Sequence, residues 1–411
     1  MKDSLTIIVI GGGAAGFFSA VTLARFCPHP QTIILEAGQE PLAKVRISGG
    51  GRCNVTHQCF EPALLVKNYP RGGKALLGAF SRFQPRDTIA WFASRGVKLK
   101  TEGDGRMFPV SDRSETIIDC LLTEAKKQGV QLRSRSPVKS LEKLGDRFSI
   151  TLKTGEILTA DRVVVATGSN LLGYRWARQF GHTIITPIPS LFTFKIPDSR
   201  LQDLAGISVD RVQVRLLHEG KNKLEQIGPL LITHWGLSGP AILKLSAWGA
   251  RILWEHRYHL SLLINWLPDE NAETLRQKFI QIKSETPRRK MFNYCPVSLP
   301  KRLWQNLLAS AAISPAKVWA ELSKKELNCA IAELVNGKYL IQGKTAFKEE
   351  FVTCGGVSLK EINFKTMESR KCPGLYFAGE ILDIDGITGG FNFQSAWTTG
   401  WLAGTAMNNE Q

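Results

Sequence analysis

Three glycines near the start of the chain have the spacing that holds a phosphate group. They form a G-x-G-x-x-G pattern directly after the apolar run 5–10 and directly before an apolar helical pattern. In such a pattern the first glycine allows a tight turn, the second lets a pyrophosphate approach the main chain, and the third lets a helix pack closely on a strand. The helix N-terminus adds N–H donors and the positive end of its dipole. The contacts predicted at this turn are Gly11, Gly13, Ala14, Ala15 and Gly16.

An acidic residue follows the next strand-like run at the distance that a dinucleotide site requires. Glu36 lies twenty residues beyond Gly16 and ends the apolar run 32–35. A carboxylate at this position accepts hydrogen bonds from ribose hydroxyls. The order of strand, glycine turn, helix, strand and acid favours a dinucleotide site over an ordinary β–α turn. Residues 5–24 are also apolar enough for a membrane span, but the three consecutive glycines at 11–13 and the acid argue against one.

A second glycine run, at 49–51, is bracketed by basic residues. Lys44, Arg46 and Arg52 give this segment positive charge, and successive glycine N–H groups form an anion-binding nest. The segment therefore predicts contacts to phosphate or ribityl oxygens of the dinucleotide. The contacts expected here are Lys44, Ser48, Gly51, Arg52, Cys53 and Asn54.

Two other kinds of chemistry are open to the cysteines of this segment. Cys53, His57 and Cys59 lie close enough in sequence to bind zinc, but they offer only three ligands, with no matching cluster elsewhere. Cys53 and Cys59 also suggest a redox disulfide of the glutathione reductase type. Five residues separate them, where that group has four, and the C-terminal His–Glu acid/base pair is not visible. We favour a packed Cys53 in a loop that lines the cofactor, and we predict no metal.

Two later turns follow strand-like runs in the same way. The run 161–165 comes after a predicted hairpin at 148–158 and ends in Ala-Thr-Gly, while the run 374–378 leads to an acid and then to a Gly-Gly turn that opens the last helix. In the larger FAD-binding folds the small turn passes close to the cofactor, and the helix N-terminus stabilises the anion that forms at the flavin N1–C2=O edge. The contacts predicted from these turns are Ala166, Thr167, Gly168, Gly379, Glu380, Gly390, Phe391 and Asn392.

The middle of the chain differs from both ends in its pattern of apolar residues. Alternating apolar residues at 212–216 and 259–264 predict strands, and helical patterns follow at 269–284, 300–311 and 323–336. This part has no second G-x-G-x-x-G, which counts against a separate nicotinamide-binding domain. We therefore predict an FAD-binding domain made of 1–188 and 345–411, interrupted at 189–344 by an insert that is β-rich and then helical.

The composition bounds the partners of the protein. The chain has 411 residues, with 53 Lys and Arg against 36 Asp and Glu, for a net charge of +17. Basic residues concentrate between 276 and 302. We favour a solvated basic face that attracts an anionic cofactor or substrate, and we keep a nucleic-acid partner as the alternative. Eight scattered cysteines and the absence of a signal-peptide pattern predict a cytoplasmic protein, and no membrane partner is expected.

Together these motifs resemble the bacterial BaiN/YhiN-type FAD-binding flavoproteins, which also carry an aminoacetone-oxidase-family label. The Ser-Gly-Gly-Gly-Arg-Cys-Asn run that ends at residue 54 and the Thr-Met-Glu-Ser run 366–369 are the most specific matches, and the matching motifs span nearly the whole chain. The resemblance implies a glutathione-reductase-like FAD-binding Rossmann domain of α/β class, with an inserted β-barrel and a small helical domain. The further FAD contacts implied by the resemblance are Ala37, Val45, main chain at Val138, and Phe393.

The resemblance and the motifs together predict an FAD-dependent oxidoreductase that passes hydride through flavin N5. NAD(P)H is the expected transient donor, and the substrate is expected to be a small unsaturated or carbonyl compound, because family members have been linked to reduction of unsaturated ring ketones. No catalytic acid or base is assigned. An RNA-associated flavoprotein of the tRNA-modifying kind is the alternative that the net charge of +17 suggests, and a flavin sensor without turnover is a third.

Overall fold

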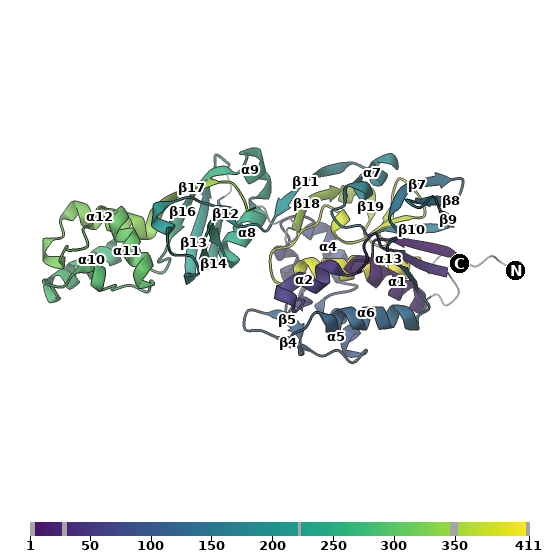
Figure 1. Cartoon of the computed structure of the whole chain (residues 1–411), viewed down its shortest axis with the longest axis horizontal. Helices are drawn as coiled ribbons and strands as arrows, with labels where there is room; N and C mark the ends of the chain where they lie inside the picture. The colour runs from purple at the N-terminus through teal and green to yellow at the C-terminus, as the bar shows by residue number, and fades with distance from the viewer. Residues whose placement is uncertain (1–4, 27–30, 221–222, 346–351, 408–411) are drawn as a thin grey trace. The chain divides into compact units, whose positions relative to one another are not determined.

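The protein is described by a computed structural model that covers residues 5–26, 31–220, 223–345 and 352–407. The chain divides into two compact units (Figure 1). The first unit combines the two ends of the chain, Met1–Ile188 and Val352–Gln411, and the second is Pro189–Phe351. No helix in the described ranges combines the length and apolar character needed to cross a membrane.

A parallel sheet forms the centre of the first unit. The strand order is β19-β20-β21-β10-β1-β2-β6, and the five strands from β21 to β6 run parallel. Their β-branched apolar runs are buried, as expected when helices cover both faces of a parallel sheet. The bounds are β1 Thr6–Ile10, β2 Gln31–Leu35, β6 Gln131–Arg133, β10 Arg162–Val165, β19 Ile362–Asn363, β20 Glu368–Ser369 and β21 Leu375–Phe377.

The first and last helices of this unit, α1 (Ala14–Phe26) and α13 (Phe391–Ala406), pack against each other (Figure 1). A Cβ at Gly400 would lie 2.7 Å from Ala15 O, and one at Gly404 would lie 2.6 Å from Ser19 O. The two backbones therefore approach so closely that only glycine fits at these positions. This contact fixes the C-terminal helix against the helix that follows the glycine turn.

Smaller elements surround this centre. The order β3-β5-β4 makes one small sheet, β7-β8-β9 a second, and β11-β18 a third. The hairpin expected at 148–158 corresponds to β8 and β9, with β7 paired beside them. The bounds are α2 Ala43–Gly51, β3 Thr56–His57, α3 Pro62–Leu65, α4 Gly73–Phe80, α5 Pro85–Ala93, β4 Leu99–Thr101, β5 Arg106–Pro109, α6 Glu115–Lys127, β7 Val138–Leu144, β8 Arg147–Leu152, β9 Ile157–Ala160, α7 Leu171–Gln179, β11 Ile184–Ser190 and β18 Val352–Val357.

The second unit contains an antiparallel sheet that closes on itself and a group of helices. The strand order is β12-β15-β14-β13-β16-β17, and a bridge between Phe194 and Lys344 joins the two edges. Closure removes the unpaired edges that an open sheet would present. The bounds are β12 Phe194–Lys195, β13 Ser208–Leu217, β14 Leu224–Thr233, β15 Gly236–Ser238, α8 Pro240–Trp248, α9 Ala250–Glu255, β16 His259–Asn265, α10 Ala272–Glu285, α11 Lys301–Ser310, α12 Lys324–Asn336 and β17 Gly337–Gln342.

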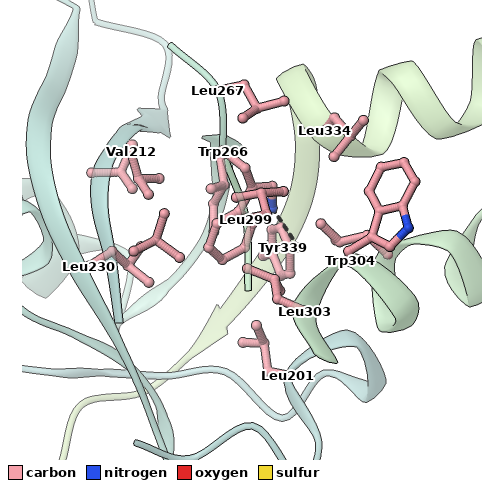
Figure 2. Close-up of a cluster of buried hydrophobic side chains, with 14 of the residues drawn as sticks. Leu201, Val212, Leu230, Trp266, Leu267, Leu299, Leu303, Trp304, Leu334 and Tyr339 are labelled. Carbon is pink, nitrogen blue, oxygen red and sulfur yellow. Dashed lines mark hydrogen bonds between the residues drawn. The ribbon is translucent and has the colours of Figure 1, made fainter. Parts of the chain in front are cut away.

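One hydrophobic core holds the closed sheet and the helices of the second unit together (Figure 2). Trp266 Nε1 donates to the Tyr339 hydroxyl at 3.3 Å, and Trp304 Nε1 donates to Met291 O at 2.9 Å. These buried rings have their polar atoms bonded, so they add apolar contact without a desolvation penalty. The expected α/β fold with an inserted barrel and helical group is confirmed.

Candidate cofactor-binding site

The glycine turn lies at the carboxyl end of β1, where open α/β sheets bind ligands. Gly11 has a φ of 112°, and a Cβ there would meet the main chain of Ala166 and lie 3.1 Å from Thr167 N. A Cβ at Gly16 would meet Gly11 O and lie 3.3 Å from Val9 Cγ1. A Cβ at Gly13 would meet nothing within 4 Å. Two of the glycines are therefore required for packing, and the third leaves the main chain open to a ligand.

Glu36 is held at the carboxyl end of β2 by main-chain donors. Gly12 N donates to its Oε2 at 2.8 Å and Gly38 N donates to its Oε1 at 2.6 Å. Its main-chain oxygen accepts from Ser136 N at 2.8 Å, which places the segment before Val138 next to it. The carboxylate is fixed beside the glycine turn, as a ribose-binding acid requires, and Ala37 follows it.

The two later turns reach the same place. A Cβ at Gly379 would lie 2.7 Å from Ala15 Cβ, and a Cβ at Gly168 would lie 3.5 Å from Glu380 Oε2. Lys44 Nζ forms an ion pair with the same Glu380 oxygen at 2.5 Å. Segments that are separated by more than 300 residues in the sequence thus converge at the N-terminus of α1.

The second glycine run forms an open nest of main chain. Helix α2 is interrupted at Ser48, which has a φ of −65° and a ψ of 148°. The three glycines that follow all have positive φ, at 57°, 69° and 82°. A Cβ at Gly50 or Gly51 would meet nothing within 4 Å, so the main chain there is accessible to an anion.

The side chain of Arg52 has its partners within its own part of the first unit. Its Nη1 donates to Glu102 Oε1 at 2.6 Å, and the guanidinium lies 4.0 Å from the centre of the Phe108 ring. The hydrogen bond to Glu102 raises the pKa of Arg52. Its main-chain N–H also has a partner, Ser48 O, so the dinucleotide contact expected at Arg52 stays a prediction.

The cysteines of this segment are free thiols. Burial raises the pKa of Cys53 to about 12, although a hydrogen bond with Ser48 opposes the shift, and burial also raises the pKa of Cys59. Because the thiolate is the reactive form, these thiols are poorly suited to disulfide exchange at neutral pH. Within the described ranges, no group of three or more His, Cys, Asp or Glu residues is arranged to hold a metal ion.

The N-terminus of α13 is fixed to the nest. With the amide of Asn54 oriented to satisfy both of its ends, its oxygen accepts from Gly390 N at 2.9 Å and its nitrogen donates to Thr56 O at 3.1 Å. The Asn392 side chain accepts from Gly386 N at 2.8 Å and donates to Gly386 O at 2.9 Å. The Phe391 ring stacks on His57, with centroids 4.7 Å apart.

Several of the expected contacts have buried side chains. Val45 is 1% exposed and Val138 is 5% exposed, so both offer main chain only. Phe393 stacks on Trp397 at 5.7 Å between ring centroids. Gln394 is fully buried and accepts hydrogen bonds from two threonine hydroxyls, at 2.6 and 2.9 Å, so it positions α13.

Two buried polar atoms beside the converging turns have no hydrogen-bond partner among the described residues: Thr167 Oγ1 and the Tyr174 hydroxyl. Tyr174 is 2% exposed, and burial together with the charges of Glu380 and Asp383 raises its pKa. A buried hydroxyl without a partner is costly, so a ligand oxygen at this position would satisfy it. Tyr174 is not among the contacts expected from the sequence. The signal in the sequence is Asn170, whose Oδ1 caps α7, the helix that carries Tyr174, by accepting from Leu172 N at 2.9 Å.

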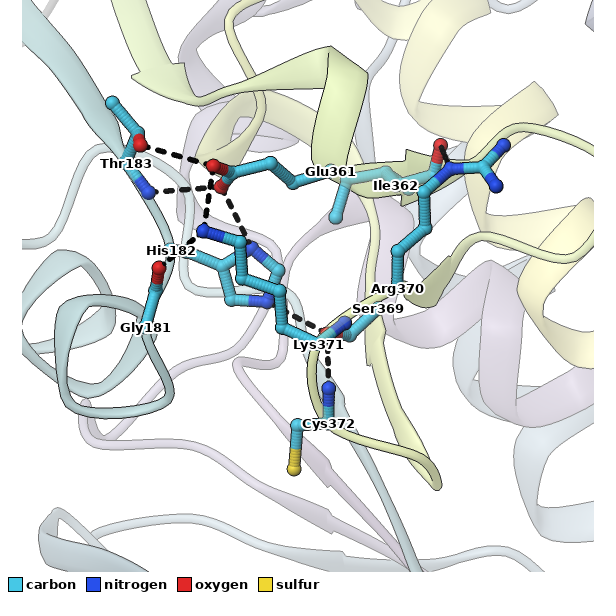
Figure 3. A network of polar contacts seen from close by, with 9 residues as sticks. All are labelled: Gly181, His182, Thr183, Glu361, Ile362, Ser369, Arg370, Lys371 and Cys372. Atoms are coloured by element: carbon cyan, nitrogen blue, oxygen red, sulfur yellow. Dashed lines mark hydrogen bonds and ion pairs between the residues drawn. The ribbon is translucent and has the colours of Figure 1, made fainter.

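A second polar cluster holds the Thr-Met-Glu-Ser segment (Figure 3). His182 Nδ1 lies 3.2 Å from Glu361 Oε2, and His182 Nε2 lies 2.7 Å from Ser369 Oγ. The order of carboxylate, imidazole and hydroxyl is that of a hydrolase triad. However, the His182 side chain is 0% exposed, and Ser369 Oγ also accepts from the main-chain N–H groups of Lys371 and Cys372. The cluster is closed to a substrate and ties β20 to the segment before β11.

Comparisons with known proteins match nearly the whole chain. Residues 5–406 match the family model of the HI0933-like protein Rossmann domain. The chain is 32% identical over 405 residues to a ribosomal RNA dihydrouridine synthase of Escherichia coli, covering 96% of each protein. It is 31% identical over 407 residues to a 3-dehydro-bile acid delta(4,6)-reductase of Clostridium scindens, covering 97% of this chain and 98% of that one. The 3-ketosteroid-delta4-(5alpha)-dehydrogenase of Rhodococcus jostii has a similar fold, with a TM-score of 0.53 at 13% identity over 100% of this chain and 98% of that one.

The residues at the site fit FAD. The main chain at Gly13 is open where a diphosphate would lie, Glu36 is fixed where a ribose would lie, and Tyr174 supplies a buried hydroxyl without a partner. The first turns of α1 and α13 contain no acidic residue that would oppose an anion at either helix N-terminus. The cofactor of this protein is FAD.

Proposed function

Because the chain belongs to the HI0933-like family of FAD-dependent oxidoreductases, we propose that it reduces a carbon–carbon double bond of uridine in ribosomal RNA. The observation that carries the choice of substrate is the net charge of +17. A polyanion is attracted by such a surface, whereas a small uncharged ketone gains nothing from it. The relatives from E. coli and Haemophilus influenzae that are named ribosomal RNA dihydrouridine synthases support the same choice.

The proposed reaction adds two hydrogens across the C5=C6 bond of the uracil ring. That bond is conjugated with the C4 carbonyl, so a hydride equivalent adds at C6 and a proton adds at C5. The overall balance is uridine, NAD(P)H and one proton giving 5,6-dihydrouridine and NAD(P)⁺. The relative named a bile acid delta(4,6)-reductase also bears a name that denotes reduction of a ring double bond.

Bound FAD supplies hydride transfer at N5, and the protein supplies binding, orientation and electrostatics. In this proposal the main chain at 11–16 and at 48–54 holds phosphate and ribityl oxygens, and Glu36 accepts from ribose hydroxyls. The N-terminus of α13 directs N–H groups toward negative charge at the flavin edge, and its position is secured because Asn54 accepts from Gly390 N at 2.9 Å. The Lys44–Glu380 ion pair orients the acid beside Gly168.

The test is an anaerobic reduction of the purified holoenzyme by NADPH or NADH, followed by mixing with a candidate oxidant. We expect the flavin absorbance near 450 nm to be bleached by one of the two donors, as is general for flavoproteins. Unmodified ribosomal RNA transcripts should restore it, and the same transcripts modified in advance should not. Failure of every transcript to restore the absorbance would contradict the RNA assignment.

A small unsaturated or carbonyl compound, as expected from the sequence, is the second candidate substrate, and a conjugated ketone is the form that the assay tests. The 31% identity to the bile acid reductase over nearly the whole chain supports it. The same assay separates the two candidates, because an α,β-unsaturated 3-ketosteroid that restores the absorbance where RNA does not would favour the small substrate.

A further inference from the structure

We propose that the second unit binds RNA through a rigid basic face formed by Arg288, Arg289, Lys290 and Lys301. This inference rests on the proposed function for its ligand, and it assigns a surface that the cofactor site does not contain.

Charge is the first observation. Between residues 276 and 302 the chain carries eight basic residues and one acidic residue, Glu285. Arg276 is paired with Glu273 at 2.6 Å, Lys278 with Glu270 at 3.5 Å, and Lys283 donates to Leu322 O at 2.7 Å. These three cations have partners within the second unit. The neighbouring cations at 288–290 and 301 are therefore the ones available to bind RNA.

The four cations of the basic face are exposed, and within the described ranges none of them has a carboxylate within ion-pair distance. The exposed acids of the adjoining segments, Glu285 and Glu321, form no ion pair with these four cations among the described residues. Phosphate oxygens spaced along a polynucleotide would neutralise such a set, and release of the counterions would drive binding.

Rigidity is the second observation. The main chain of the triplet 288–290 pairs with the segment 317–320, through Trp319 N to Arg289 O at 3.1 Å and Met291 N to Lys317 O at 3.1 Å. Trp319 is fully buried and packs on Phe279, with ring centroids 5.5 Å apart. The triplet therefore lies on a fixed backbone, so ordering it on RNA costs less conformational entropy than ordering a free loop.

The Arg289 side chain is also ordered. Its guanidinium lies 3.9 Å from the centre of the Tyr294 ring. Stacking on the ring holds the planar group and leaves its edge N–H donors for a phosphate. An arginine held in this way suits a polynucleotide backbone better than a mobile lysine does.

Lys301 belongs to the same rigid surface as the triplet. Helix α11 begins at Lys301, and Gln305 Nε2 of this helix donates to Phe292 O at 3.0 Å. The helix that carries Lys301 is therefore fixed to the turn that follows the triplet.

The test compares RNA binding by the holoenzyme with binding by the triple variant Arg288→Gln, Arg289→Gln, Lys290→Gln. The matched control is Lys126→Gln, Lys127→Gln, Lys153→Gln, which removes the same charge from exposed positions of the first unit. The probe is a fluorescent ribosomal RNA transcript titrated over a range of salt concentrations. Loss of three phosphate contacts should lower the slope of log K against log salt by about two to three, and should weaken binding at low salt by at least about tenfold. The control should bind like the unmodified protein.

Two results would overturn this inference: equal salt slopes for both triple variants, or binding of phosphatidylglycerol vesicles by the unmodified protein without binding of RNA. Variants that retain FAD and the far-UV circular dichroism of the unmodified protein exclude misfolding as the cause of a loss. The reoxidation assay keeps the two proposals apart. If transcripts reoxidise the triple variant at the rate of the unmodified protein, the role of the basic face is contradicted and the proposed function is supported. If RNA binding depends on the basic face but RNA does not reoxidise the flavin, the proposed function is contradicted and the role of the basic face is supported.

Discussion

Gly13 and Gly16 are adjacent members of one motif, and the structure predicts opposite consequences for adding a methyl group to each. A Cβ at Gly13 would meet nothing within 4 Å, and Gly13 does not have a positive φ. Gly13→Ala should therefore fold without steric strain. Limiting the unfolded chain stabilises the FAD-free protein by up to about 1 kcal/mol, and the preference for glycine over alanine just before α1 opposes this by a similar amount. The methyl group would instead occupy the space through which a diphosphate approaches the main chain.

The expected cost at Gly13 falls on FAD binding. A main-chain hydrogen bond to a charged group contributes about 1.5–3 kcal/mol, so losing one such contact should weaken FAD binding by roughly ten- to hundredfold. Gly16→Ala should act on folding, because its Cβ would meet Gly11 O and lie 3.2 Å from Gly11 C. Overpacking of this kind costs about 1–3 kcal/mol.

The assay is thermal unfolding of both variants with and without added FAD, together with FAD titration by fluorescence. Gly13→Ala should unfold close to the unmodified temperature without FAD, and should gain less stability than the unmodified protein when FAD is added. Gly16→Ala should unfold earlier in both conditions. Unmodified FAD affinity in Gly13→Ala would refute the placement of the diphosphate at this turn.

Three further predictions follow from buried groups. Tyr174→Phe should weaken FAD binding by about tenfold in an FAD titration, as expected for one lost hydrogen bond. Thermal unfolding of the FAD-free protein should show no loss of stability. Unchanged FAD affinity would exclude Tyr174 from the site. Burial lowers the pKa of His182 although Glu361 opposes the shift, so the stability that His182 contributes is complete above its ordinary pKa of 6.5 and is lost as the pH falls below it. Burial alone would raise the pKa of Glu361, but hydrogen bonds from Lys371 and Thr183 lower it to about 2, so its contribution is complete above 4.5 and is lost toward pH 2. Urea unfolding from pH 7 to pH 3 should show both losses, and Glu361→Gln should flatten the acid limb; parallel curves for variant and unmodified protein would contradict this. Cys53→Ser should not change the rate at which NAD(P)H reduces the flavin in stopped-flow measurements. A large decrease in that rate would instead support a redox disulfide at Cys53.

The local motifs were readable from the sequence because each depends on residues close together in the chain. The glycine turn and Glu36 followed from spacing, and the α/β fold followed from these motifs together with the family resemblance. The helices expected at 269–284, 300–311 and 323–336 appear as α10, α11 and α12. The strands β14 and β17 were not predicted. The first half of β14 has little burial contrast, and β17 follows α12 without a turn between them.

Side-chain partners distant in sequence could not be predicted in this way. Arg52 bonds to Glu102, fifty residues away, and its residue type alone did not predict this partner. Gln394 bonds to Thr56 and Thr88, which sequence spacing does not bring together. Tyr174 was not predicted because the burial of its hydroxyl near Glu380 and Asp383 depends on elements more than 200 residues away in the sequence.

The most direct test of this account is the mass of the RNA after the reaction. The holoenzyme with NADPH or NADH is incubated with an unmodified ribosomal RNA transcript, which is then digested to nucleosides and analysed by mass spectrometry. Because reduction adds two hydrogens, we expect a nucleoside about 2 Da heavier than uridine, formed only when the reduced nicotinamide is present. RNA that keeps every uridine at its original mass, while the same enzyme saturates a conjugated ketosteroid, would contradict it.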